Sequence, residues 1–519
     1  MYRRLCISLS LLVTLLLAGC RGDFLLPDQA DSLPAEGSKI SIASLINREI
    51  TTRSYIVEGR YYGYDAAEGS FMVSDDTGRI KVKGADNISD WTEIFGKEGT
   101  VAVSGKLRID GDEGRTVYSL GESHIEDVTT NVLIFLAAGF NNLYPDIQGN
   151  LTQMINSAVP NRDSPCKLVV VSHFATNYTY TPPQEIVVEQ ISMDLGKGIE
   201  RDTLFHTSAA TLLDPAVMNT ALTVVKDRFP AAAFGMLLSS HGTGWMPPGY
   251  YGSSTSTILF SNHRRSGTQG LVPYRKNTGE GPRVKTFGAE VYLKDGSKLS
   301  QEMDIAALAA AIPMHLDYMI FDACLMGSVE VVYELRDVAD MICASPAEVL
   351  SYGFDYSASE LLLSRNPSPE GFCEAYFKHY DKMTGINRSA TISVVRTDAL
   401  GGLASVCRDL TAKYRSQISA LDAYSNVQRY YRYDWHWIYD FEDVFVKAGI
   451  DAEEKARLDA ALDACIIYKA TTPAFLKSYG GFEINTYSGL SMYLPGAGDS
   501  ALNASYRQTA WNKAIQLVE

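Results

Sequence analysis

The feature that most limits the fold is a series of short, uninterrupted apolar runs that begins at residue 131. Strands that read as continuously apolar are typical of a parallel sheet that is covered on both faces. The stretches Pro215 to Arg228 and Met303 to Ala311, which lie between such runs, have a helical pattern. Strands that alternate with helices predict an α/β fold, in which helices cover a mostly parallel sheet as an α/β/α sandwich. The apolar runs are 132–139, 167–171, 234–239, 316–321 and 341–344.

Residues 38–128 have a different pattern of apolar and polar residues. Short runs of alternating apolar and polar residues, such as 55–59 and 79–82, are separated by turns rich in Gly and Asp, such as 75–78. This spacing predicts a small all-β domain, either a barrel or a sandwich. The segment resembles OB-type domains, but its basic residues are few and scattered, so we expect an accessory or spacer domain rather than an oligonucleotide-binding groove.

The start of the chain predicts export and a lipid anchor. A basic start, Met1 to Arg4, precedes an apolar run, Cys6 to Ala18, that is too short to span a membrane comfortably. Leu17-Ala18-Gly19-Cys20 resembles a bacterial lipobox, so we expect a signal peptide at 1–19, diacylglycerol on Cys20 and a tether at 20–37. This predicts attachment to the bacterial cell envelope, at the outer membrane. An ordinary signal peptide that is cut near Gly19 is the alternative.

Charge and cysteine content exclude several classes of protein. The formal net charge is −15, and removal of residues 1–19 takes away two arginines and no acid, which makes it −17. Such a chain lacks the basic face that nucleic acids require. Past Cys20 the cysteines are sparse, without metal-ligand spacing, so we expect neither a disulfide scaffold nor a structural metal. Most of them are predicted to be core residues, and Cys324 is the exception. The six are Cys166, Cys324, Cys343, Cys373, Cys407 and Cys465.

Two of the apolar runs end in side chains that can carry chemistry. The run 234–239 is followed by Ser240 and His241, and the run 316–321 leads to Asp322 and Cys324. In open α/β sheets, catalytic groups collect beyond the carboxyl ends of the strands. If these two strands are parallel neighbours, His241 and Cys324 emerge at one edge of the sheet. This interpretation also requires the Cys324 sulfur to be reachable rather than sealed in the core.

Residues 327–335 form an amphipathic pattern that predicts a helix, which places Cys324 at or just before a helix N-terminus. There the helix dipole favours the thiolate. His241 can take the thiol proton and later protonate the leaving amine. The N–H groups of Gly242 and Cys324 are candidate donors to an oxyanion.

The residues around the pair carry a family resemblance. Residues 237–245 and 321–330 closely resemble the two catalytic blocks of the clostripain family of cysteine peptidases, and the resemblance continues in 344–348, 352–356 and 489–495. It spans 131–519, which we therefore interpret as a peptidase domain. The resemblance implies a caspase-like fold and peptide-bond hydrolysis by a Cys324–His241 dyad, without a third triad member.

Clostripain relatives often prefer Arg or Lys before the cut, read by acidic groups in the substrate pocket. Asp322 matches one such position, although it can equally be a strand-end residue that caps the following helix. After Ala344 and Ser345, where relatives selective for basic residues tend to carry an acid, this chain has Pro346. Basic specificity therefore stays an open hypothesis, with Glu348 and Asp355 as further candidate pocket acids and Ser345 as a further candidate pocket residue.

Two further segments are candidates for a functional role. The Gly- and Ser-rich stretch 249–298 contains three basic pairs or near-pairs and is a candidate site of self-processing, or else a solvated loop. The aromatic run 430–439 is predicted to be a half-buried helix near the rim of the site rather than a sugar platform.

No motif in the chain requires a cofactor or a catalytic metal. We expect a monomer whose partners are a protein or peptide substrate and, through Cys20, a membrane. The alternative to a cysteine endopeptidase is a surface lipoprotein of the same fold that binds peptides or glycans without cutting them.

Overall fold

The computed structural model describes residues 33–92, 99–112, 115–230, 232–247, 288–294, 297–432 and 437–519. The chain divides into two compact units, and the last division falls between Ile125 and Glu126. The predicted signal peptide, Cys20 and most of the tether lie outside the described residues, as does most of the 249–298 stretch. Among the helices that are described, none combines the length and the apolar character needed to cross a membrane.

The N-terminal strands close into a barrel, which decides between the two predicted β architectures. The neighbour order is β1, β2, β3, β5, β4. Burial alternates along β1 and β3, so that Ile80 and Val82 of β3 point into the core while the residues between them do not. The strands are β1 (Ser54–Asp65), β2 (Ser70–Asp75), β3 (Gly78–Lys83), β4 (Thr100–Asp112) and β5 (Arg115–Thr129), preceded by the short helix α2 (Ile42–Asn47).

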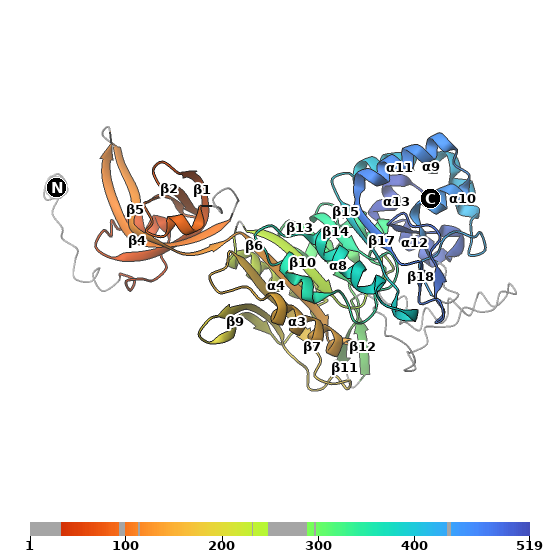
Figure 1. The fold of residues 1–519 in the computed structure, drawn as a ribbon, viewed down its shortest axis with the longest axis horizontal. Coiled ribbons are helices and arrows are strands. Elements are labelled where there is room, and N and C mark those ends of the chain that lie inside the picture. The colour runs from red at the N-terminus through yellow and green to blue at the C-terminus, as the bar shows by residue number, and fades with distance from the viewer. Residues whose placement is uncertain are drawn as a thin grey trace, which may run out of the picture. The chain divides into compact units, whose positions relative to one another are not determined.

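The second unit is built on a sheet of nine strands (Figure 1). Its order is β17, β15, β14, β13, β10, β6, β7, β8, β9. The central strands β14, β13, β10, β6 and β7 run parallel to one another. Further out, each strand pairs antiparallel with its inner neighbour: β15 with β14, β17 with β15, β8 with β7, and β9 with β8. The bounds are β6 (Asn131–Gly139), β7 (Cys166–Phe174), β8 (Ile186–Asp194), β9 (Gly198–Thr207), β10 (Ala233–Ser239), β13 (Leu316–Asp322), β14 (Ala339–Ala344), β15 (Thr391–Arg396) and β17 (Ile466–Thr471).

Each of the five predicted apolar runs corresponds to one of the five central parallel strands. All nine residues of β6 are buried, as are six of the seven in β10. Continuous burial of this kind requires cover on both faces of the sheet, which explains why these strands lack the alternation seen in the barrel. The prediction of an α/β fold with a mostly parallel central sheet is confirmed.

Two connected series of helices pack in this unit. One comprises α3, the 3-10 helix η3 and α8, and the other runs from α4 through α6, α7 and α13 to α9, α10 and α11. The predicted helix at Pro215 to Arg228 is α4, which begins with Pro215 after the N-cap Asp214. The bounds are α3 (Tyr144–Ala158), α4 (Pro215–Arg228), α6 (Ile305–Ala311), α7 (Val329–Glu334), η3 (Tyr356–Leu361), α8 (Pro369–Asp381), α9 (Leu400–Ala420), α10 (Phe441–Ala448), α11 (Ala452–Cys465), α12 (Ser500–Tyr506) and α13 (Ala510–Ile515).

The remaining elements are short. Three antiparallel pairs lie outside the large sheet: β11 with β12, β16 with β20, and β18 with β19. They are β11 (Glu290–Lys294), β12 (Ser297–Gln301), β16 (Ile438–Asp440), β18 (Ala474–Phe475), β19 (Phe482–Glu483) and β20 (Ser491–Tyr493), with 3-10 turns η1 (Ile88–Trp91), η4 (Gly385–Asn387) and η5 (Pro495–Ala497).

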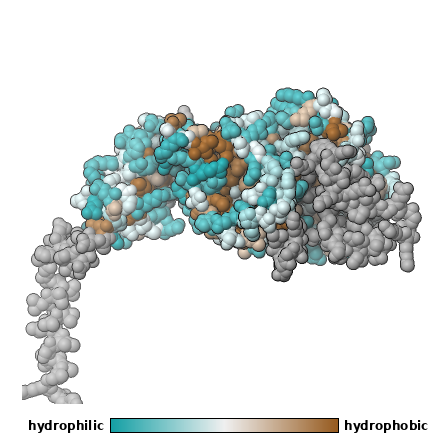
Figure 2. Space-filling view, turned by 90° about the horizontal axis from the view of Figure 1, so that it is seen from below, coloured by the Kyte–Doolittle hydropathy of each residue, from teal (hydrophilic) through white to brown (hydrophobic). Residues whose placement is uncertain are grey.

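The face of the molecule in Figure 2 is mostly hydrophilic, with smaller hydrophobic areas between. Large exposed apolar side chains come from unrelated elements, for example Leu195 between β8 and β9, and Tyr424 after α9. Scattered residues of this kind are normal on a protein surface and indicate no particular partner.

A glycine allows β10 and β13 to pack closely. Gly235 of β10 lies opposite Tyr318 of β13, and a Cβ on Gly235 would come within 2.0 Å of the Tyr318 ring. Tyr318 is only 3% exposed, so its ring has little room to move away. The absence of a side chain at Gly235 is therefore what lets a tyrosine fill this part of the core.

We expect Gly235→Ala to lower the free energy of unfolding by about 1–3 kcal/mol, because the added methyl overpacks a filled core. Gly149→Ala is the matched control: Gly149 is in α3 with nothing near its Cβ position, so alanine should stabilise by about 0.5–1 kcal/mol. Denaturant unfolding followed by tryptophan fluorescence measures both. Equal stability of the two variants would contradict the packing argument.

Candidate active site

The strands that carry His241 and Cys324 are parallel neighbours, as the sequence analysis required. Ser239, the last residue of β10, pairs with Asp322, the last residue of β13. The Ser239 hydroxyl also donates a hydrogen bond to the Asp322 carboxylate, 3.0 Å from Oγ to Oδ2. His241 lies two residues after Ser239, and Cys324 lies two residues after Asp322. The two loops therefore leave the sheet at the same level and at the same edge.

The two loops that follow these strands touch through Gly244. Its φ is +66°, and a Cβ there would lie 2.9 Å from the carbonyl oxygen of Leu325. Leu325 itself has a φ of +64°, an uncommon conformation for a leucine that costs on the order of 1–3 kcal/mol. The loop after His241 and the loop after Cys324 therefore pack closely through their backbones, and this packing keeps Leu325 in a strained conformation.

A third segment, residues 345–349, lies along the cysteine loop. The Leu325 N–H donates to the Ala347 carbonyl at 2.9 Å, and the Gly327 N–H donates to the Ser345 carbonyl at 2.9 Å. Gly327 is needed for this approach, because a Cβ there would lie 2.5 Å from the Pro346 nitrogen. We call residues 345–349 the covering segment.

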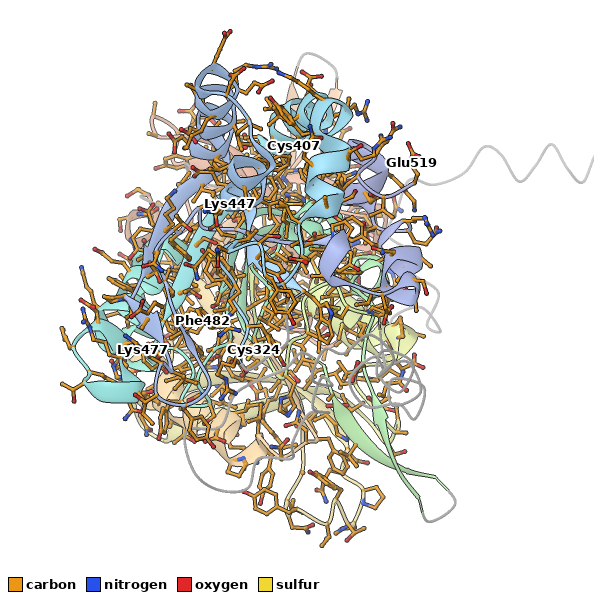
Figure 3. The ribbon with its side chains drawn as sticks, turned by 90° about the vertical axis from the view of Figure 1, so that its right-hand side faces the viewer. Cys324, Cys407, Lys447, Lys477, Phe482 and Glu519 are labelled. Atoms are coloured by element: carbon orange, nitrogen blue, oxygen red, sulfur yellow. The ribbon has the colours of Figure 1, made fainter. Side chains whose placement is uncertain are left out.

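The covering segment contacts the Cys324 sulfur. The Val349 N–H donates to Sγ at 3.2 Å, and Sγ contacts the Val349 carbonyl oxygen at 3.6 Å. Cys324 is 0% exposed, and Figure 3 shows it among the elements of its unit rather than at their outline. The expectation that the thiol is reachable from solvent is therefore wrong for this arrangement, which we call the closed conformation. The other cysteines, predicted to be core residues, are also buried.

The prediction that Cys324 sits at or just before a helix N-terminus is also wrong. Helix α7 begins at Val329, and its N-cap is Ser328, whose side chain accepts from the Val331 N–H. Cys324 thus precedes the N-cap by several residues. The N–H of Val349 donates to the sulfur instead.

His241 is held by a residue that the sequence analysis missed. His241 is 6% exposed, and its Nε2 lies 2.8 Å from Oδ1 of Asn142. An amide oxygen only accepts, so Nε2 carries a proton and Nδ1 is the nitrogen that can accept one. Asn142 follows β6, the other neighbour of β10, and a polar residue just past a predicted central strand was the signal that would have identified it.

Asp322 lies in a closed polar cluster. It is 0% exposed and accepts from the Tyr356 hydroxyl at 2.7 Å and from the Asn150 side chain at 3.5 Å, in addition to Ser239. Gly353 approaches so closely that a Cβ there would be 2.8 Å from Asp322 Oδ2. The alternative interpretation of Asp322 as the cap of the next helix is wrong, because Ser328 fills that position.

The other predicted pocket residues surround the same region but have local partners. Ser345 is buried, with its hydroxyl 2.6 Å from Thr391 Oγ1 and 3.0 Å from the Ala347 carbonyl. Asp355 caps η3 by accepting from the Ser357 N–H at 3.2 Å. Gly242 is buried directly after His241. The roles of these residues stay predictions.

Glu348, in the covering segment, is engaged by Arg432. Nη2 of Arg432 lies 3.0 Å from Oε1 of Glu348, and Nε contacts Oε2. Arg432 belongs to the aromatic run 430–439, of which residues 433–436 lie outside the described part. The prediction of a helix there is wrong: the Tyr430 N–H donates to the Ile438 carbonyl at 3.0 Å, and residues 438–440 form β16. Aromatic residues fit a half-buried extended chain as well as a helix.

An aromatic cluster lies behind the histidine loop. The Trp245 ring meets the rings of Tyr493 and Tyr506 edge to face, at centroid distances of 4.8 and 5.1 Å. The Tyr493 N–H donates to Oε1 of Glu330 in α7 at 2.9 Å. Burial raises the pKa of the Glu330 carboxyl to about 7. This cluster thus connects the loop after His241 with the helix after Cys324.

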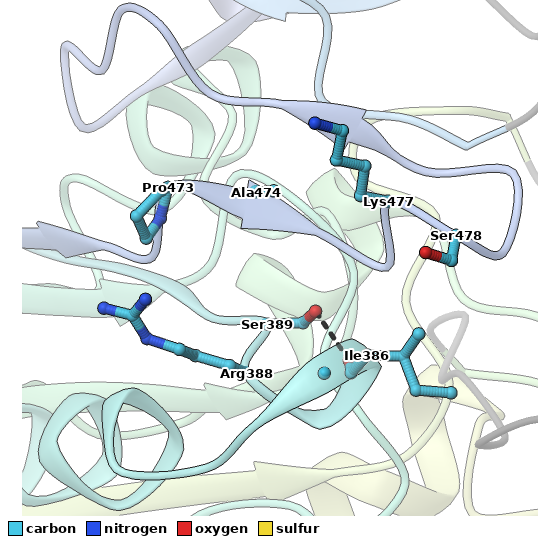
Figure 4. A pocket seen from close by; sticks show the side chains of 8 residues that line it. Ile386, Arg388, Ser389, Pro473, Ala474, Lys477 and Ser478 are labelled. Carbon is cyan, nitrogen blue, oxygen red and sulfur yellow. Dashed lines mark hydrogen bonds between the residues drawn. The ribbon is translucent and has the colours of Figure 1, made fainter.

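The described residues outside this region offer little that resembles a second site. Over the described ranges, no group of three or more His, Cys, Asp or Glu side chains is gathered to hold a metal ion. A surface hollow near η4 and β18 (Figure 4) is bordered by residues that include Arg388, Ser389 and Lys477, but by neither His241 nor Cys324. Ser389 there donates to the Ile386 carbonyl at 2.8 Å, so its hydroxyl is used within the turn.

Comparison with known proteins agrees with the resemblance. The sequence model of the clostripain family matches residues 294–515. An inactive zymogen of a C11 protease from Parabacteroides distasonis is 25% identical and superimposes with a TM-score of 0.58, covering 75% of this chain and 98% of that one. A secreted C11 cysteine protease from Bacteroides thetaiotaomicron, solved with an irreversible peptide inhibitor, has the same fold at 22% identity and a TM-score of 0.57, covering 75% and 99%. A search of curated proteins finds no match.

The contact at Gly244 can be tested by Gly244→Ala. The variant should lose about 1–3 kcal/mol of stability, because alanine is strained at this φ and its methyl meets the Leu325 carbonyl. Amide hydrogen exchange should also quicken at Leu325 and Gly327, whose hydrogen bonds hold the covering segment. Gly402→Ala, in α9 with nothing near its Cβ position, is the control. Exchange at Leu325 equal to wild type would show that the two loops are independent.

Proposed function

We propose that this chain, a member of the clostripain family and a cysteine-type peptidase, is an endopeptidase that uses Cys324 as its nucleophile and His241 as its acid and base. In the proposed reaction His241 accepts the thiol proton, and the sulfur attacks the carbonyl carbon of the scissile bond. His241 then protonates the leaving amine as the C–N bond breaks. Water hydrolyses the resulting thioester, with the proton again passing through His241.

The observation that carries this proposal is the register of β10 against β13, which starts both loops from one level of the sheet. The contact between Gly244 and Leu325 then keeps the loops together. The N–H groups of Gly242 and Cys324 are proposed to donate hydrogen bonds to the oxyanion that develops on the carbonyl oxygen. Asn142 is proposed to hold the imidazole so that Nδ1 can accept the thiol proton. It would then be a third member of the site, which the resemblance alone did not imply.

The closed conformation is proposed to be an inactive form. Substrate reaches the sulfur only if the covering segment moves away from Cys324. In the closed conformation the Val349 N–H donates a hydrogen bond to this sulfur. The relative from Parabacteroides distasonis was solved as an inactive zymogen, which supports a latent state on this fold. The second candidate function, a binder that does not cut, is favoured by the same burial of the sulfur.

Self-processing within 249–298 is proposed as the event that opens the site. The far end of this stretch is well anchored: Glu290 is 0% exposed, pairs with His173 at 2.9 Å, and accepts from the Thr211 hydroxyl at 2.7 Å. A cut before this anchor leaves the chain that follows attached to the fold. The basic residues proposed as cut sites, at 264–265, 275–276 and 283–285, lie outside the described residues.

A preference for Arg or Lys before the cut is proposed from the acids near Cys324, chiefly Asp322 and Glu348. Export and lipid attachment at Cys20 are proposed from the first twenty residues, and the secreted relative from Bacteroides thetaiotaomicron is consistent with export. We further propose that the chain is a monomer and that the barrel is an accessory domain.

Replacing either member of the pair tests the proposed reaction. Cys324→Ala and His241→Ala should each lower kcat/KM for peptide hydrolysis by on the order of a thousandfold or more, because each removes a group that acts on the reacting atoms. Cys407→Ala, a buried cysteine of α9, is the matched control and should keep its activity. Binding of peptide without hydrolysis, in wild type as in the variants, would favour the non-cutting alternative.

Self-processing is tested by N-terminal sequencing of purified full-length protein over time. We expect new ends within 249–298 in the wild type and none in Cys324→Ala, because the proposed cut uses the chain's own sulfur. Activity should rise as the new ends form. If Cys324→Ala is cut equally, or if uncut wild type is fully active, self-processing is not the activating step.

The residue preference is tested with peptides that differ only before the cut: Arg, Lys, Ala or Asp. We expect kcat/KM to be at least about tenfold higher for Arg and Lys than for Ala, because a hydrogen bond to a charged group contributes about 1.5–3 kcal/mol. Equal rates for all four would end the proposal of basic specificity while leaving the peptidase assignment in place.

A further inference from the structure

Glu348 occupies a special position beside Cys324. The carbonyl of Ala347 accepts from the Leu325 N–H, and both backbone groups of Val349 contact the Cys324 sulfur. Glu348 lies between these two residues and is the only charged residue of the covering segment. A movement of the covering segment away from the sulfur therefore displaces Glu348 as well.

The partner of Glu348 comes from a distant part of the chain. Arg432 meets the carboxylate with two nitrogens, Nε on Oε2 and Nη2 on Oε1 at 3.0 Å. The two side chains are only 9% and 5% exposed. Arg432 also lies over the Tyr479 ring, 5.8 Å from its centroid. This is a two-pronged guanidinium–carboxylate pair in a largely buried site.

The geometry of this pair is the one that a substrate arginine would make. Two parallel hydrogen bonds to a carboxylate are the arrangement by which proteins recognise arginine. Asp322, the other acid close to Cys324, is already enclosed by Ser239 and Tyr356. Glu348 is thus the acid of the covering segment, its present partner is a cation, and a buried carboxylate is unfavourable without one.

We propose that Arg432 is a specificity-determining residue: it occupies, in the closed conformation, the carboxylate that receives the basic side chain before the cut. A substrate with Arg or Lys at that position exchanges its own cation for Arg432, so Glu348 stays paired throughout. This rests on the proposed peptidase function and its basic preference. Arg432 competes with substrate and so lowers the apparent affinity for basic peptides.

The test measures kcat/KM of the full-length protein for two peptides that differ only before the cut, with Arg or with norleucine. Arg432→Gln should raise the Arg-to-norleucine ratio by about tenfold, because it removes a competitor that keeps most molecules in a state unable to bind the substrate cation. Glu348→Gln should lower the ratio below that of wild type. The double variant Arg432→Gln/Glu348→Gln should behave as Glu348→Gln does.

Arg388→Gln is the matched control, since Arg388 pairs with Asp381 at 2.7 Å on another part of the surface, and its ratio should equal that of wild type. If Arg432→Gln does not fold, the double variant decides, because it leaves no buried charge unpaired. A ratio that stays at the wild-type value in Arg432→Gln overturns the proposal. If Arg432→Gln does not fold, a wild-type ratio in the double variant overturns it. If wild type hydrolyses neither peptide, the result instead contradicts the peptidase function itself.

Discussion

The parallel pairing of β10 with β13 is the constraint on which the rest of the site depends. It places Ser239 opposite Asp322 and so sets the level at which two loops leave the sheet. The pairing is close because Gly235 leaves room for the Tyr318 ring. Beyond the strands, Gly244 rests on the Leu325 carbonyl. Residues that are far apart in the sequence are thus joined by backbone packing before any side-chain chemistry is considered.

The covering segment adds a second layer of control. Its backbone satisfies the N–H groups of Leu325 and Gly327, and Val349 contacts the sulfur. The same segment carries Glu348, whose charge is balanced by Arg432. Under the proposed function, access to Cys324 and recognition of a basic side chain would change together when residues 345–349 move.

The sequence was a good guide wherever burial alone decided the outcome. The five central strands are continuously apolar, and Pro215 after Asp214 marks the start of α4, so these elements were predictable. Contacts between distant side chains were not: no pattern reveals that Tyr356 and Asn150 enclose Asp322, or that Arg432 reaches Glu348. The aromatic run 430–439 was misread as a helix because large rings are buried equally well along an extended chain. The start of α7 was placed too early because its amphipathic pattern extends back through Gly327 and Ser328.

The most direct test of the central claim is the rate at which iodoacetamide alkylates Cys324 as a function of pH, resolved by mass spectrometry, in wild type and in His241→Ala. If the two residues act as a pair, wild-type Cys324 should react well below the pH at which ordinary thiols ionise once the 249–298 stretch has been cut in both proteins by an added protease, and His241→Ala should lose that reactivity. Alkylation of Cys324 that is no faster than that of the core residue Cys407, and unchanged by His241→Ala, would contradict the account.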